Sequence, residues 1–140
     1  TMGYVVMQAQ QRAGVVCRRY WFDYVAEAEH ATYTNGAWHG NEVPYVFDTL
    51  GQVEPSRQYV NERDLAFAAQ VADYWVSFAR DAGARDSLVG PTRWPACRKG
   101  RDVLLRIGVN KHAGFRLENR FMRARMSLFK RVMKHHVSLD

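Results

Sequence analysis

The chain has 140 residues, which is enough for one domain or for part of a larger one. Hydrophobic residues make up 47% of it and charged residues 24%, and these values exclude a disordered chain. The net charge is +6, and basic residues far outnumber acidic ones from Arg98 onward. Such a basic tail is typical of a solvated helix face; the alternative is a surface that binds nucleic acid or an anionic membrane.

The two cysteines, Cys17 and Cys97, are too few for a disulfide framework, and no Cys/His cluster has the spacing of a metal site. We therefore expect no metal and no cofactor, and the pattern leans towards a reducing compartment such as the cytoplasm. Cys17 lies in an apolar run and is expected to be a buried small side chain. The sequence has no apolar run of about 18 residues and no recognisable signal peptide.

The first elements expected along the chain are a helix and then a strand. The helix runs from Met2 to Ala13 and ends at Gly14. The strand runs from Val15 to Tyr24, a stretch rich in β-branched and aromatic residues. Apolar residues occupy both faces of this strand, which predicts a sheet covered by helices on both sides, as in α/β folds.

A short helix or buried turn is expected at Val43 to Leu50, and the clearest helix begins after Asn61, which can cap it together with Asp64. One face of this helix, at spacings of three and four, carries Leu65, Ala68, Ala72, Trp75 and Ala79. A short strand is expected at Val103 to Val109. A second long helix, with an apolar stripe and a basic remainder, is expected at Phe115 to Val137.

His39 stands out among the five histidines because of its neighbours. It lies between Gly36 and Gly40, in a polar loop that follows the expected first strand. Glycines allow tight turns and the close approach of a substrate. Loops beyond the carboxyl ends of parallel strands are where α/β proteins place their chemistry. His39 is therefore a candidate catalytic or binding residue, and a structural or solvent-exposed histidine is the alternative.

The segment from Gly36 to Glu42 reads G-x-x-H-G-x-E, and a hydrophobic stretch ending in Val46-Phe47 follows it. Three further motifs lie around it: Y-x-F-D-Y at 20–24, Y-W-x-x-F-A at 74–79 and a Trp-Pro pair at 94–95. In order and spacing these motifs resemble those of the type B carboxylesterases, the cholinesterase-like branch of the α/β-hydrolases. The resemblance covers roughly Val5 to Val109, and the basic last helix matches only loosely.

The resemblance implies the α/β class, with residues 1–140 as the C-terminal portion of an α/β-hydrolase domain and not a complete one. Its order would be helix, strand, loop, helix, strand, helix. The sequence contains no G-x-S-x-G elbow and no glycine-rich oxyanion loop, and in α/β-hydrolases the triad runs in the order serine, acid, histidine. The resemblance thus implies that the chain is part of a serine carboxylic-ester hydrolase. Its expected partner is the N-terminal part of the enzyme, which carries the serine and the acid. The chain would act on an ester substrate only together with that part.

Under this resemblance His39 is the general acid/base of the triad. Glu42 would not react itself but would hold the loop of His39 through hydrogen bonds. The alternative is that Glu42 is a partly solvated surface carboxylate. Trp38 would line the substrate pocket, or it would only pack. Trp75 and Phe78 are expected in the core.

Two other functions remain open. One is a non-catalytic interaction module, because some cholinesterase-like proteins are adhesion molecules. The weaker one is a basic domain that binds nucleic acid or membranes, although no nucleic-acid partner is expected. A piece of a hydrolase would also expose a sheet edge and apolar surface, which predicts self-association of the chain.

Overall fold

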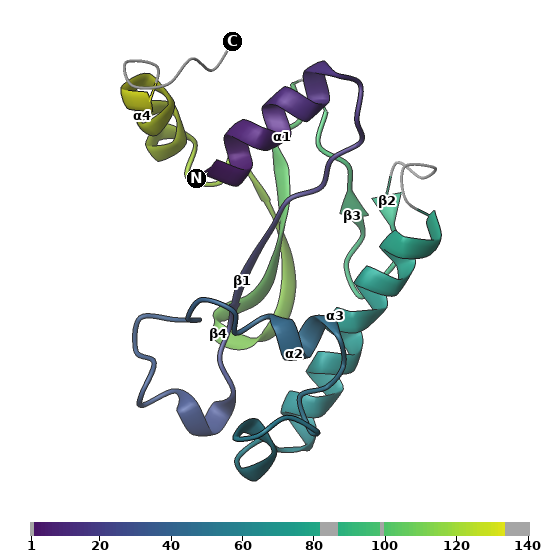
Figure 1. The fold of residues 1–140 in the computed structure, drawn as a ribbon, viewed down its shortest axis with the longest axis vertical. Helices are drawn as coiled ribbons and strands as arrows, with labels where there is room; N and C mark the ends of the chain where they lie inside the picture. The colour runs from purple at the N-terminus through teal and green to yellow at the C-terminus, as the bar shows by residue number, and fades with distance from the viewer. Residues whose placement is uncertain (1, 82–86, 99, 134–140) are drawn as a thin grey trace.

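The computed structural model describes residues 2–81, 87–98 and 100–133. Its elements, shown in Figure 1, are α1 (Met2–Arg12), β1 (Tyr20–Tyr24), α2 (Val43–Val46), α3 (Glu62–Asp81), β2 (Ser87–Leu88), β3 (Trp94–Pro95), β4 (Val103–Asn119) and α4 (Arg123–Met133), with 3-10 turns at Glu27–Glu29 and Ser56–Gln58. The expected first helix, the short helix after Val43 and the helix after Asn61 are confirmed. In the described part of the chain, none of the helices has both the length and the apolar character that a membrane crossing needs.

A parallel strand pair forms the centre of the fold. β1 pairs with β4, so that Tyr20 lies opposite Leu105 and Phe22 lies opposite Ile107. The register then shifts, and Tyr24 pairs with Lys111. Gly108 accommodates this irregularity: its φ is +81°, and a Cβ there would lie 2.4 Å from the Tyr24 backbone nitrogen. A parallel pair with helices beside it is the α/β arrangement that the sequence predicts.

The first strand is shorter than expected, because regular pairing with β4 begins only at Tyr20. Upstream, Cys17 faces a different segment and forms an isolated antiparallel bridge with Cys97, whose backbone nitrogen donates to the Cys17 oxygen at 2.8 Å. Both cysteines are buried free thiols, as expected for Cys17. Burial raises the pKa of each thiol.

The second long helix was expected to begin at Phe115, and this prediction is wrong. Residues 115–119 belong to β4, and the helix begins at Arg123; the expected end at Val137 lies outside the described residues. β4 folds back on itself at Asn110 and Lys111, which both have positive φ, the pattern of a type I′ turn. Arg120 then donates from its backbone nitrogen to the Asp102 oxygen at 2.9 Å, so both ends of β4 lie together.

The main core lies between α3, β1 and β4. Its buried residues are Tyr24, Tyr45, Leu50, Phe67, Ala68, Val71, Tyr74, Leu88, Trp94, Leu105 and Ile107. α3 contributes a face that differs from the expected one: Asp64, Phe67, Ala68, Val71 and Tyr74 are buried. Leu65 is 40% exposed, and so is Phe78, which was expected in the core; Trp75 packs against the core and is partly buried.

Candidate functional site

His39 lies on the long loop that joins β1 to α2, and its side chain is exposed. The loop turns sharply around it: the Asn41 nitrogen donates to the Trp38 oxygen at 3.2 Å. Gly40 occupies the third position of this turn with φ of +84°, a conformation that glycine adopts without a steric cost. Gly36, on the other side, also has positive φ, +100°. The flanking glycines therefore present the His39 imidazole at the tip of a tight turn.

Asn41 ties this turn to the central strand. Its side chain is 5% exposed, and its amide nitrogen Nδ2 donates to the Tyr24 backbone oxygen at 2.8 Å. Tyr24 is the last residue of β1, so the hydrogen bond joins the end of the loop to the end of the strand. Asn41 was missed in the sequence, where a single asparagine beside a glycine looks like any turn residue.

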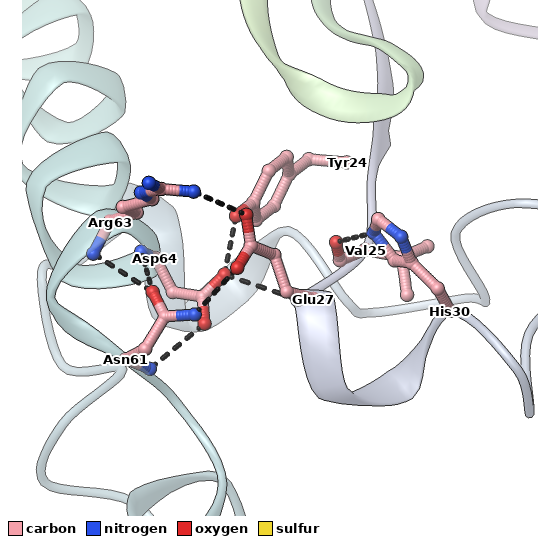
Figure 2. A network of polar contacts seen from close by, with 7 residues as sticks. All are labelled: Tyr24, Val25, Glu27, His30, Asn61, Arg63 and Asp64. Carbon is pink, nitrogen blue, oxygen red and sulfur yellow. Dashed lines mark hydrogen bonds and ion pairs between the residues drawn. The ribbon is translucent and has the colours of Figure 1, made fainter.

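The beginning of the same loop is held by Asp64, which lies in the first turn of α3 and is fully buried. Figure 2 shows its carboxylate accepting hydrogen bonds from the Tyr24 hydroxyl, from the Glu27 backbone nitrogen at 3.3 Å and from the Asn61 backbone nitrogen at 2.9 Å. Three donors offset the cost of burying the charge. Burial and the Asp64 hydrogen bond raise the Tyr24 pKa well above its ordinary range.

A second layer of contacts surrounds Asp64. Asn61 caps α3 as expected, accepting from the Arg63 and Asp64 nitrogens at 2.9 and 3.0 Å. The Asn61 side chain also donates to Glu27 at 2.9 Å, and Arg63 lies 3.6 Å from the same carboxylate (Figure 2). These bonds join the start of the His39 loop to the N-terminus of α3.

The imidazole of His30 is not free but contacts the backbone of the loop. Its Nε2 lies 2.8 Å from the Val25 backbone oxygen, and its own backbone oxygen accepts from Lys111 at 3.1 Å (Figure 2 shows the first contact). Lys111 lies at the turn of β4. The loop is therefore fixed to β1, β4 and α3 before it reaches His39.

The other two candidates share the loop with His39. Trp38 is 47% exposed, and its ring centroid lies 6.1 Å from that of Tyr33. Glu42 is half-buried at the N-cap of α2 without a side-chain capping hydrogen bond; its backbone oxygen accepts from Tyr45 and Val46 at 3.1 and 3.0 Å. Within the described residues the Glu42 carboxylate makes no hydrogen bond, and the loop-holding contact expected of it is made by Asn41.

Among the described residues, no hydrogen bond or ion pair joins the His39 ring to a serine, to a carboxylate or to any other partner. Across residues 2–81, 87–98 and 100–133 there is also no group of three His, Cys, Asp or Glu that could hold a metal. The arrangement can therefore present one exposed imidazole, on a loop whose two ends are fixed by Asp64 and Asn41.

We compared the sequence and the fold with those of known proteins. The profile of the carboxylesterase family matches residues 4–128, nearly the whole chain and including the His39 loop. The chain belongs to the carboxylesterase family. A crystal structure of a carboxylesterase from Geobacillus stearothermophilus has a similar fold, with a TM-score of 0.64 and 24% sequence identity. The match covers 86% of this chain and 23% of that one, so the chain spans about a quarter of that carboxylesterase. No curated protein matches the sequence.

The family assignment agrees with the resemblance read from the sequence motifs. It confirms an α/β-hydrolase type of fold, of which the chain contains only a part.

Proposed function

We propose that this chain supplies the triad histidine, His39, of a serine carboxylic-ester hydrolase. The observation that carries the proposal is the exposed imidazole between two positive-φ glycines, on a loop that starts at the carboxyl end of a parallel strand. Membership of the carboxylesterase family supports it. In α/β-hydrolases the histidine comes last in the triad, after the serine and the acid.

In the assembled enzyme His39 takes the proton of a serine hydroxyl as that oxygen attacks the ester carbonyl. It then protonates the departing alcohol, and it repeats the cycle with water as the attacking group. Imidazole suits this exchange because its ordinary pKa of about 6.5 lies near neutral pH. A carboxylate from the same segment as the serine holds the ring in the correct tautomer.

The serine comes from polypeptide outside these 140 residues, since the sequence contains no G-x-S-x-G. We place the acid on the same polypeptide, because in α/β-hydrolases the acid precedes the histidine. That segment is the partner of this chain, and it would cover apolar side chains such as Phe47, which is 70% exposed. Trp38 lines the ester pocket beside His39. The chain alone is inactive.

The test begins with the coding sequence upstream of Thr1, where a G-x-S-x-G elbow is expected. The protein encoded by that extended frame should hydrolyse p-nitrophenyl esters, and the 140-residue chain should not. His39→Ala in the extended protein is expected to lower kcat by at least about 10²–10⁴-fold, the contribution of general acid/base catalysis.

The matched control is His112→Ala, which removes another exposed imidazole, on β4; its ring lies 5.2 Å from that of His30, near the start of the loop, and not at the turn that carries His39. It should leave kcat within about twofold. Turnover by the 140-residue chain that disappears in His39→Ala would show a nucleophile within it. Equal losses in the two variants, or an upstream frame without the serine motif, would contradict the proposal and favour a non-catalytic interaction module.

A further inference from the structure

A cavity of about 920 Å³ is lined by residues of α1 and α4. These two helices lie at the opposite end of the molecule from the loop between β1 and α2 (Figure 1). The cavity is bordered by α1, by residues 14–16, by residues 96–98 and 100–102, by Arg120, and by Arg123 and Lys130 of α4. Lys130 of α4 donates to the Gln8 side chain of α1 at 3.0 Å and so joins the two helices across it. The volume is within the range of small-molecule sites.

The lining of this cavity is strongly basic. Its cationic side chains are Arg12, Arg98, Arg101, Arg120, Arg123 and Lys130. Among the described residues of the lining the only acid is Asp102, whose carboxylate is already paired with Arg19. Several positive charges therefore surround one hollow with little negative charge to offset them.

Three of these arginines have no carboxylate partner. Within the described residues, no Asp or Glu oxygen lies within ion-pair distance of Arg12, Arg120 or Arg123. Cations gathered on one concave surface repel each other and raise the local positive potential. An anion bound there would relieve this repulsion, and planar guanidinium groups match phosphate oxygens in pairs.

A second observation points to a ligand. The side-chain nitrogen Nε2 of Gln11, which also lines the cavity, is buried and has no acceptor within the described part of the chain. A buried donor without an acceptor is costly, and native proteins rarely leave one. An oxygen of a bound anion would satisfy it. Met7 and Val15 also line the cavity, so its lining is not wholly charged.

We propose that this cavity binds a small molecule carrying several phosphate groups. Arg12 from α1 and Arg123 from α4 approach it from two helices, and Arg120 lies between β4 and α4. The site is separate from ester hydrolysis, so it stands or fails independently of His39. A nucleic acid or a membrane would need an extended surface, whereas these cations converge on one hollow.

The test is calorimetric titration of the chain with inorganic tripolyphosphate at physiological salt. The double variant Arg12→Gln/Arg123→Gln is expected to raise the Kd by at least about tenfold, because it removes two charge-assisted contacts. The matched control, Arg57→Gln/Arg80→Gln, removes the same charge at exposed positions outside the cavity and should change the Kd less than about twofold.

A second readout is thermal stability. Tripolyphosphate should raise the Tm of the parent chain and of the control more than that of the double variant in the cavity, because a ligand stabilises the folded state according to its affinity. Parallel titrations use single-stranded RNA and phosphatidylserine vesicles. Equal losses in the two double variants, or tight binding of RNA or vesicles without binding of tripolyphosphate, would overturn the proposal.

Discussion

Asp64 is a charged residue type that lies on the buried face of α3. It lies in the first turn of α3, where the sequence suggests only a capping role. The structure buries it completely and surrounds it with the Tyr24 hydroxyl and the Glu27 and Asn61 nitrogens. These contacts link α3 to the end of β1 and to the start of the His39 loop, so a buried carboxylate positions an exposed imidazole.

Replacing Asp64 by Asn keeps the shape and removes acceptors. The amide nitrogen of Asn cannot accept a hydrogen bond, so at least one of the three donors is left unpaired inside the protein. The free energy of unfolding is expected to fall by about 1–3 kcal/mol, measured by urea denaturation. Asp73→Asn, on the exposed side of the same helix, should change it by less than about 0.5 kcal/mol. Equal free energies of unfolding for the two variants would show that Asp64 does not anchor α3 to β1 and the loop.

At the scale of elements, the pairing of β1 with β4 depends on Gly108. Its positive φ and the close approach of the Tyr24 backbone leave no space for a side chain. The register shift that follows takes β4 to the turn at Asn110 and Lys111, and that turn brings Phe115 back to the core beside Phe67 and Tyr74. One glycine thus decides the path of the chain that follows it.

Gly108→Ala should therefore lower the free energy of unfolding by more than the cost of a positive φ alone, because the added Cβ also clashes with the Tyr24 backbone. Gly100→Ala separates the two effects, because Gly100 has φ of +83° but nothing within 4 Å of an added Cβ. The control is expected to cost about 1–2 kcal/mol, the usual cost of a left-handed residue, and Gly108→Ala more than that. Thermal unfolding of the two variants checks the difference. Equal losses would mean that β1 can move away from β4 at no cost.

For the whole molecule, the decisive feature is how much apolar surface is left uncovered. In the described part of the chain β1 pairs with β4 alone, and Trp21, Trp38 and Phe47 are 40%, 47% and 70% exposed. An open strand edge beside exposed aromatic side chains favours contact with another chain. The proposed partner segment would cover this surface in the assembled hydrolase.

Without that segment, the 140-residue chain is expected to self-associate. Sedimentation velocity over a concentration series should show the weight-average mass rising with concentration, because copies of the chain cover each other's apolar surface. Phe47→Asn should weaken the association without lowering the Tm, since this side chain is exposed. A well-folded monomer at every concentration would show that the chain covers its own core sufficiently.

Local sequence patterns were enough to predict the range of α1, the start of α3, the cap at Asn61, the turn glycines beside His39 and the motifs of the family. These depend on neighbours in the chain, through periodicity, capping and φ preferences. Only the tertiary structure decided that residues 115–119 are strand, that Asp64 is buried and that Asn41 holds the loop, because their partners are distant in sequence. The basic cavity likewise forms only when α1, the segment around Asp102 and α4 come together.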